Sequence, residues 1–328
     1  MNKKVVALTV IGMICLVAGI FASISLGAKE ISIGEIYNAI FHYTESELNQ
    51  QLIREVRAPR MLSALLVGGM LALTGAMMQG VLKNPISEPS IMGVTQGATL
   101  AVAIASVSPV ISGMYGNFFM GLFGSFLSGV LILLFSMRSA GNQSLSKILL
   151  AGTALSTFFL SLASVVALLG NRSQELAFWI AGGFRQANWG QVGVLVTIGG
   201  TFSVLALCMT GKINLINLGD EVAVGLGVSP EKIKLFTILC LIPICGVCVS
   251  AAGNIGFVGL FIPHIIRKII GSDYRIILPL SFLWGSVVLV VADIFARMLM
   301  APYELPVGLF TACIGVPVFL MLVRKENR

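Results

Sequence analysis

Charged side chains are scarce in this sequence. Asp, Glu, Lys and Arg together make up 11% of the 328 residues, against roughly 25% in an ordinary soluble domain. Hydrophobic residues make up 57%. This balance excludes an ordinary soluble enzyme and a disordered chain. The formal net charge of +7 is spread between long apolar runs, so the chain also lacks the clustered basic patch of a nucleic-acid-binding protein.

Several catalytic motifs are missing as well. The chain has no G-x-x-x-x-G-K-[ST] phosphate loop, so it is not expected to hydrolyse nucleotide itself. It has only two histidines, and it lacks both H-E-x-x-H and a Cys/His set with metal-binding spacing. The six cysteines fall in apolar stretches and are interpreted as small buried hydrophobic residues. No catalytic residue and no metal ligand is therefore predicted.

Long uncharged windows dominate what is present. A helix needs about 20 apolar residues to cross the hydrocarbon core of a bilayer. Eight uncharged windows meet or approach this length, and two of them are long enough for two helices each. The windows for one helix lie within Lys4–Lys29, Arg60–Lys83, Lys147–Arg172, Arg185–Lys212, Arg275–Asp293 and Glu304–Arg324. The windows for two helices lie within Glu88–Arg138 and Lys234–Arg267. The sequence therefore predicts an all-α, polytopic transmembrane bundle of about ten helices, in a single domain spanning residues 1–328.

An even number of spans places both termini on the same side of the membrane. If that side is the cytoplasm, the inner loops and termini carry twice as many Lys and Arg residues as the outer loops, as the positive-inside rule expects. Lys3 and Lys4 followed by an apolar run could also begin a signal peptide, but no clean A-x-A cleavage site follows. We expect a retained first helix and cytoplasmic termini.

Ionisable groups within the spans are few. Asp293 and Arg297 lie four residues apart on one predicted helix and are interpreted as a helix-end pair. No ladder of Asp, Glu or His crosses the bilayer, which argues against proton-coupled transport. Small residues recur in the second span at Gly68, Ala72, Ala76 and Gly80, a pattern that lets another helix approach closely and predicts an interior helix.

The longest predicted cytoplasmic segment covers residues 213–230. Asp220 can cap a short helix over 222–226, and Gly227 suits the position after its end. Val222, Ala223 and Leu226 would form a small apolar face there. Two interpretations are equally favoured from the residues alone: a helix lying on the inner leaflet, and a surface that docks a cytoplasmic partner.

Four motif blocks together resemble the FecCD-type permeases of ABC importers for iron–siderophore, haem and cobalamin. Residues 57–98 contain R-x-P-R, a glycine-rich helix, and N-P-[LI]-x-x-P. The other blocks, in the family's order, are LGDEVAVGLGV at Leu218–Val228, GFVGLFIPHIIR at Gly256–Arg267, and D-x-x-A-R followed by E-x-P-V-G and G-x-P at Asp293–Pro317.

The resemblance implies a set of partners. Such a permease pairs with a second copy of itself or with a homologous permease in the lipid bilayer of the cell membrane. Two separate ATP-binding cassette subunits use ATP and Mg, and an external substrate-binding protein delivers the ligand. The permease itself would hold no cofactor and no metal. An iron–siderophore is the expected cargo, with haem and cobalamin as alternatives.

The resemblance also assigns roles to residues. Exposed arginines on the outer side would dock the binding protein: Arg57, Arg60 and Arg297. Coupling to the ATPase would involve Gly219, Asp220, Glu221, Ala223 and Leu226. Candidates for the translocation path, for which ordinary helix–helix hydrogen bonding is an equal alternative, are Ser156, Thr157, Ser161 and Ser164.

Two other functions stay open at this stage. An ion-coupled secondary transporter would work without an ATPase, and a membrane scaffold would transport nothing. Arg172 and Arg185, both predicted outside, could meet an anionic ligand or act as ordinary interfacial anchors.

Overall fold

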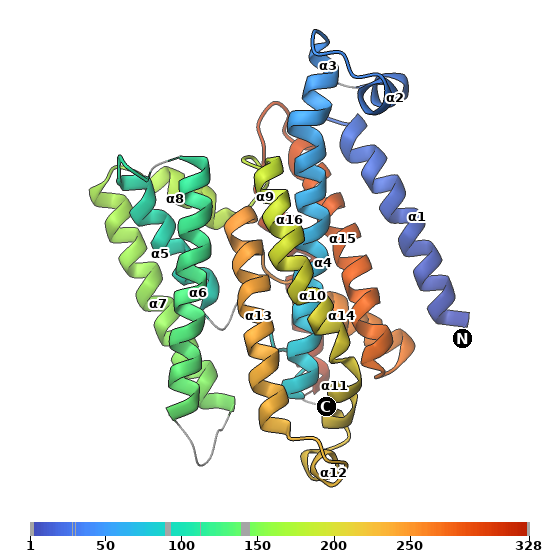
Figure 1. Cartoon of the computed structure of the whole chain (residues 1–328), viewed down its shortest axis with the longest axis vertical. Coiled ribbons are helices and arrows are strands. Elements are labelled where there is room, and N and C mark those ends of the chain that lie inside the picture. Colours follow the sequence, from blue (N-terminus) through green and yellow to red (C-terminus); the bar gives the residue numbers. More distant parts are fainter. Residues whose placement is uncertain are drawn as a thin grey trace.

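The fold is helical throughout the residues that the computed structural model describes, which are 3–27, 29, 31–88, 93–111, 113–138 and 145–326. This confirms the predicted all-α class. The helices (Figure 1) are α1 (Lys3–Ser25), α2 (Ile33–Phe41), α3 (Leu48–Gln51), α4 (Ala58–Leu82), α5 (Val94–Val107), α6 (Met114–Arg138), α7 (Leu145–Leu169), α8 (Ser173–Ala181), α9 (Trp189–Val194), α10 (Gly200–Cys208), α11 (Thr210–Asn217), α12 (Asp220–Gly225), α13 (Pro230–Ala252), α14 (Val258–Ile270), α15 (Tyr274–Met298) and α16 (Val307–Glu326), with π-helical turns η1 (Leu52–Arg57) and η3 (Leu195–Gly199).

Seven helical stretches are long and apolar enough to cross a membrane, counted over the described residues. They correspond to α1, α3–α4, α6, α7, α9–α10, α13 and α15. The three other predicted spans correspond to α5, α14 and α16, of which α14 has only 13 residues. A helix of that length covers about 20 Å, less than the ~30 Å hydrocarbon core. Non-helical backbone must therefore complete the crossing beside α14.

Helix α4 lies at the centre of the bundle and packs against α15, α13 and α14. Its small residues explain the close contact. A Cβ added to Gly68 would overlap the carbonyl of Gly285 on α15, and one added to Gly75 would overlap the backbone of Gly259 on α14. The small-residue pattern thus predicted an interior helix correctly.

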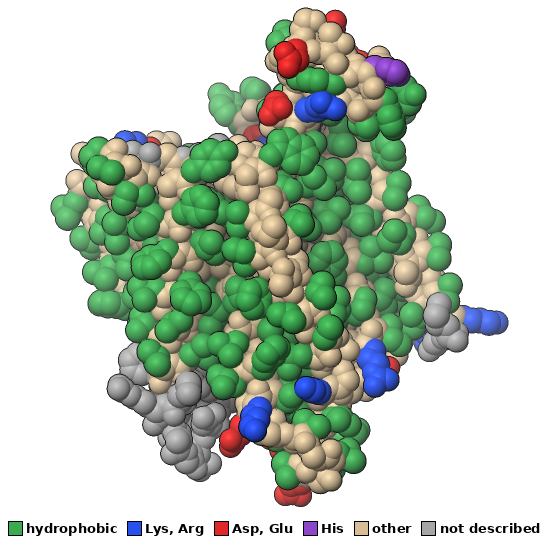
Figure 2. Space-filling view, viewed as in Figure 1, with side chains coloured by type: hydrophobic (Ala, Val, Ile, Leu, Met, Phe, Trp, Pro, Cys, Tyr) green, Lys and Arg blue, Asp and Glu red, His purple; other side chains and the backbone are tan. Residues whose placement is uncertain are grey.

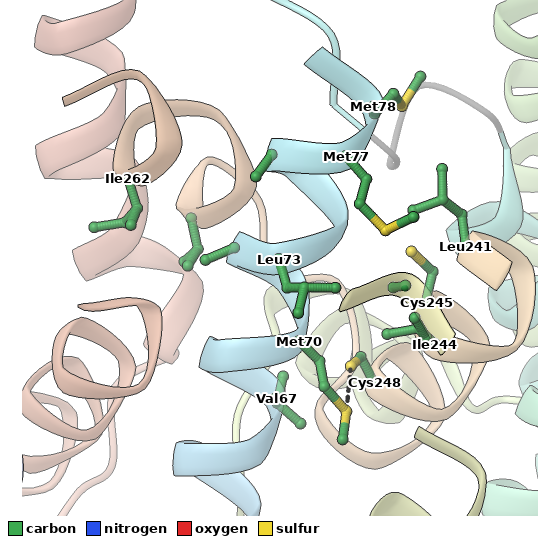
Figure 3. Packing of buried hydrophobic residues seen from close by; sticks show 14 of the residues in the cluster. Val67, Met70, Leu73, Met77, Met78, Leu241, Ile244, Cys245, Cys248 and Ile262 are labelled. Atoms are coloured by element: carbon green, nitrogen blue, oxygen red, sulfur yellow. Dashed lines mark hydrogen bonds between the residues drawn. The ribbon is translucent and has the colours of Figure 1, made fainter. Parts of the chain in front are cut away.

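The core around α4 is apolar and rich in sulfur. Figure 3 shows Met70 and Met77 of α4 facing Cys245 and Cys248 of α13. The Sγ of Cys248 lies 3.9 Å from the Sδ of Met70. Three of the six cysteines are buried as predicted; Cys15 is half-buried, and Cys208 and Cys313 are exposed.

The two ends of the bundle differ from its flank. Figure 2 shows hydrophobic side chains over the flank, with charged side chains gathered toward the two ends. We call the end that carries α2 and α3 the α2 end, and the opposite end the α12 end. The beginning of α1 and the end of α16 lie toward the α12 end (Figure 1). An apolar flank between two charged ends is the surface expected of a protein that spans a bilayer.

Candidate functional site

Toward the α2 end, the arginines predicted to dock a partner are engaged within the chain. Arg57 is buried, and its guanidinium donates to the backbone carbonyl oxygens of Ile24, Ser25 and Lys29. These three carbonyls lie at and just after the end of α1. Arg57 therefore ties the end of α1 to η1 through both terminal nitrogens of its planar guanidinium.

Arg60 and Arg297 share one carboxylate. Asp293 on α15 is completely buried, and it accepts hydrogen bonds from Arg60 Nε at 3.1 Å and Arg60 Nη2 at 3.0 Å. The Nε of Arg297 lies 3.2 Å from Asp293 Oδ2. Arg60 Nη1 also donates to Glu304 Oε1 at 2.7 Å. The network joins α4, α15 and the loop before α16.

The expectation that Arg57, Arg60 and Arg297 are exposed is wrong. Arg57 and Arg60 are 5% and 7% exposed, and the Arg297 side chain is 9% exposed. Burying a guanidinium is costly unless it is paired, and the Asp293 carboxylate supplies a partner for Arg60 and Arg297. For Arg60 the physical reason for the error is distance in sequence, since Asp293 and Glu304 come more than 230 residues after it. Whether these arginines also respond to a docked partner stays a prediction.

The two other predicted outer arginines are partly exposed and each has an acidic partner. Arg172 pairs with Glu175, three residues away on α8. Arg185 Nε lies 3.3 Å from Glu304 Oε2. Glu304 lies in the loop before α16; burial raises its pKa, but the hydrogen bond from Arg60 and the nearby arginine charges outweigh burial and lower it.

At the α12 end, the predicted coupling segment forms a short exposed helix. Gly219 is the N-cap of α12, with φ of 131°, and Gly227 follows the helix with φ of 79°. Both values lie where glycine is favoured over other residues. The helix, its glycine after the end and its place at one tip of the molecule were predicted correctly (Figure 1).

Asp220 does not cap this helix, contrary to the prediction. Its carboxylate instead lies 2.7 Å from Lys83 Nζ and 3.1 Å from Lys234 Nζ. The ammonium of Lys83 lowers the pKa of Asp220, and Lys234 adds to the effect. Two charge-assisted contacts outcompete a single neutral backbone N–H. They tie α12 to the end of α4 and to the first turn of α13.

The apolar face of α12 is partly different from the predicted one. Ala223 is completely buried, so it packs inward and does not belong to the exposed face. The exposed apolar side chains of this segment are Leu218, Val222, Val224 and Leu226. Exposed apolar side chains gathered at a tip indicate a contact surface.

The four hydroxyl residues predicted for the path lie on α7. Thr157, Ser161 and Ser164 are exposed and Ser156 is half-buried. Each hydroxyl donates to the carbonyl oxygen four residues earlier, at 2.7–3.0 Å. Hydroxyls satisfied in this way leave a weakly polar face without a fixed charge.

An open groove of about 670 Å³ runs beside this face of α7. Its walls come from α7, α8, the loop before α14 and the beginning of α16. Ser156 and Thr157 line it, whereas Ser161 and Ser164 lie farther along α7 outside its lining. The other described lining residues are Glu88, Gln96, Thr153, Ile180, Ala181, Asn254, Gly256, Phe257, Pro306, Gly308 and Leu309.

Non-helical backbone from three segments meets next to the groove. The Gly183 N–H donates to the Ala252 carbonyl at 2.8 Å, and the Val307 N–H donates to the Gly182 carbonyl at 3.0 Å. The segments around 182, 253 and 306 thus satisfy one another's backbone groups. Irregular backbone at membrane depth is stable only where it is buried in protein or lines a cavity. This arrangement explains how the short α14 fits into a spanning bundle.

Glu88 is the charged residue among the described lining residues, and sequence reasoning did not single it out. Its Oε1 accepts a hydrogen bond from the Phe257 N–H at 2.7 Å. The signal was present in the sequence, because Glu88 lies within the N-P-[LI]-x-x-P block. In the sequence analysis Glu88 was used only as the boundary of an uncharged window. Its partner Phe257 is 169 residues away, so the contact could not be foreseen.

Comparison with known protein families shows which family this chain belongs to. The FecCD transport family matches residues 15–325, nearly the whole chain. The chain belongs to the FecCD transport family.

Individual relatives of this FecCD chain cover it from end to end. The iron(3+)-hydroxamate import system permease protein FhuB of Bacillus subtilis is 41% identical, over 98% of this chain and 84% of FhuB. The Fe(3+)-citrate import system permease protein YfmD of the same organism is 37% identical, over 96% of this chain and 94% of its own. The hemin transport system permease protein HmuU of Yersinia pestis is 32% identical, over all of this chain and 98% of HmuU.

A solved structure has the same architecture. It is described as an inward-facing conformation of a metal-chelate type ABC transporter, and it superposes with a TM-score of 0.84 at 30% identity, over 99% of this chain and all of that one. The FecCD chain is therefore a membrane-spanning permease component of an ABC-type importer. Both the secondary-transporter and the scaffold alternatives are set aside by this membership.

Proposed function

We propose that this FecCD chain carries a ferric chelate across the cell membrane, taking it from an external binding protein and using ATP hydrolysed by separate subunits. The observation that supports this most is the open groove beside the hydroxyl-bearing face of α7. The hydroxyl groups on this exposed face bond to their own helix, so the face is weakly polar and carries no fixed charge. A bulky chelate suits such a surface, because its iron is already fully held by the chelator.

A hydroxamate siderophore is our first choice of cargo. FhuB, at 41% identity, is named for iron(3+)-hydroxamate, and the relatives named for Fe(3+)-citrate and hemin are less similar. Haem and cobalamin remain the alternatives. The chain itself is proposed to bind no cofactor and no metal, and ATP and Mg belong to the partner subunits.

The groove also supports pairing of two permeases. It is an open groove, lined in part by α7 and the beginning of α16, so a single copy does not enclose it. A second copy of this chain, or a homologous permease, would close it and would cover the exposed hydroxyls. We propose that the translocation path forms in this way between two subunits, with Ser156, Thr157, Ser161 and Ser164 on its wall.

We propose that α12 is the surface that receives the ATPase. Val224 and Leu226 project from it, and Asp220 holds it to two neighbouring helices through Lys83 and Lys234. A helix braced in this way can transmit a push to α4 and α13. Gly219 and Glu221 belong to the same coupling surface, whereas Ala223 packs beneath it. In this orientation the α12 end and both termini are cytoplasmic.

The α2 end would then face the binding protein. Because Arg57, Arg60 and Arg297 are internally paired, we propose that they fix the shape of this platform. An acid of the binding protein would reach Arg60 or Arg297 only by competing with Asp293 or Glu304, and Arg57 only by competing with the carbonyls after α1, so direct contact is the secondary possibility.

The test is ligand-stimulated ATP hydrolysis by the permease assembled in nanodiscs with its ATPase and binding protein. Ferric hydroxamates, ferric citrate, haem and cobalamin are compared. We expect a ferric hydroxamate to bind the binding protein tightly and to raise the rate. No co-purifying ATPase and no response to any ligand would overturn the proposal.

The proposal that α12 receives the ATPase is tested by a separate variant. Val224→Asp should weaken co-purification of the ATPase, because it places a charge in the apolar contact. Val110→Asp is the control, at a valine in the turn between α5 and α6 that is even more exposed than Val224 (90% against 62%), and it should leave co-purification unchanged. Equal loss in both variants would contradict docking at α12.

A further inference from the structure

The described lining of the groove beside α7 carries negative charge but no positive charge. Among its described lining residues, Glu88 is the single charged one, and no Lys or Arg lines it. The remaining polar groups are hydroxyls and amides: Thr153, Ser156, Thr157, Gln96 and Asn254. By contrast, the arginines of the chain's α2 end lie outside this lining. Among the described residues, a cargo that passes along the groove therefore meets the Glu88 carboxylate and otherwise neutral groups.

Glu88 is held firmly in place. Its Oε1 accepts the Phe257 N–H at 2.7 Å, and Phe257 is the residue that precedes the first turn of α14. A carboxylate at a helix N-terminus is stabilised by the unpaired N–H groups and by the helix dipole. Phe257 itself has φ of 71° and packs against Gly315 of α16. The charge is thus anchored at the N-terminus of α14, at a fixed point of the wall.

A second observation indicates which ligand chemistry the wall prefers. The Oε1 of Gln96 is buried and has no hydrogen-bond partner, and Gln96 lines the same groove. An unpaired buried carbonyl oxygen lowers its free energy by accepting a hydrogen bond. Together with the Glu88 carboxylate on the lining of the same groove, this oxygen offers an acceptor, which suits N–H and ammonium groups on a ligand.

We infer that Glu88 is a specificity-determining residue of the translocation groove, which favours neutral or cationic ferric chelates over anionic ones. The inference rests on the proposed function, and it adds a charge rule that the names of the relatives do not contain. A trihydroxamate chelate of Fe(III) is neutral at its metal centre, so its pendant group alone sets its charge. A carboxylate-rich chelate would be repelled at Glu88.

A matched series of chelates tests the charge rule. One ferric trihydroxamate is prepared with a pendant ammonium, with the same amine acetylated, and with the amine converted to a succinamic acid. Initial uptake rates are measured in proteoliposomes that contain the whole importer, at saturating amounts of each chelate-loaded binding protein. The binding protein is identical in every comparison, so its own preference cancels when variants are compared.

Glu88→Gln is the decisive variant, because glutamine can still accept from the Phe257 N–H while it lacks the charge. For unit charges passing within ~8 Å in a well-hydrated groove with an effective dielectric constant of about 60, we expect the ammonium-to-carboxylate rate ratio to fall about tenfold, because the ammonium loses an attraction and the carboxylate loses a repulsion. Gln96→Glu adds a carboxylate to the same wall and should raise the ratio. Thr157→Val removes a hydroxyl without changing charge and should leave the ratio unchanged.

The outcomes separate this inference from the proposed function. If the unmodified importer moves none of the three chelates with ATP, the proposed function fails. If it transports them and Glu88→Gln slows all three equally, Glu88 serves only to hold α14 and the charge rule is refuted. Should Glu88→Gln fail to assemble, the Gln96→Glu ratio decides: a rise supports the rule, and an unchanged or lower ratio refutes it.

Discussion

The buried carboxylate of Asp293 permits a sharp prediction about stability. It is 0% exposed and pairs with Arg60 and Arg297, whose side chains are 8% and 9% exposed. Asp293→Asn keeps the size of the side chain and removes its charge. Arg60 keeps one acidic partner, Glu304 at 2.7 Å, whereas Arg297 keeps only its hydrogen bonds to Ser23 and Leu26.

Removing one partner of a buried ion pair costs about 3–5 kcal/mol. The lower value alone changes the folding equilibrium constant by about a hundredfold. Arg172→Gln is the control, because the Arg172–Glu175 pair is about half exposed and such pairs contribute about 0–1 kcal/mol.

Thermal unfolding in detergent, followed by the fraction of monodisperse protein on a sizing column, measures both variants. We expect a large downward shift of the midpoint for Asp293→Asn and almost none for Arg172→Gln. The double variant Asp293→Asn with Arg297→Gln should lose less than the sum of its single variants, because the second change removes the unpaired charge. Equal midpoints for the two single variants, or simple additivity in the double variant, would refute the network as a source of stability.

Three further predictions concern packing, the path and pH. Gly75→Val should abolish assembly, because its side chain would overlap Gly259, whereas Gly200→Ala meets open space and should be tolerated; yields of monodisperse protein compare the two. Ser161→Cys, in a background without the native exposed cysteines, should react with a membrane-impermeant maleimide and become protected when chelate is transported; absence of labelling in every state would place it in lipid. Because the pKa of Asp220 is lowered, its lysine contacts should persist at neutral pH and weaken only as the pH falls below about 4, so ATPase association that already declines between pH 7 and 6 would contradict this brace.

The class of the molecule and its central helix were within reach of sequence reasoning because they depend on local composition. Scarce charge and repeated apolar windows indicate a membrane bundle whatever its partners are. The spacing of Gly68, Ala72, Ala76 and Gly80 indicates close helix packing, and Gly68 does meet Gly285. The position of α12 at a tip followed from a polar segment with glycines at both ends.

The site was less predictable because its contacts join distant parts of the chain. From the sequence, Arg60 was interpreted as an exposed outer charge. In the structure, Asp293 pairs with it from a helix far along the chain. Asp220 was predicted to cap a helix, but the fold brings Lys83 and Lys234 beside its carboxylate instead. Glu88 was overlooked for the same reason, since its partner Phe257 comes from another loop. Helical periodicity also misassigned Ala223, because α12 is too short to show which face is covered.

The central claim is that transport by this chain is driven by ATP through partner subunits. The most direct measurement is uptake of a radioactive ferric hydroxamate into proteoliposomes that contain the permease, its ATPase and the loaded binding protein. The account predicts accumulation that requires enclosed ATP on the α12 side and stops when Val224→Asp detaches the ATPase. Uptake by the permease alone, driven by an ion gradient without ATP, would contradict it.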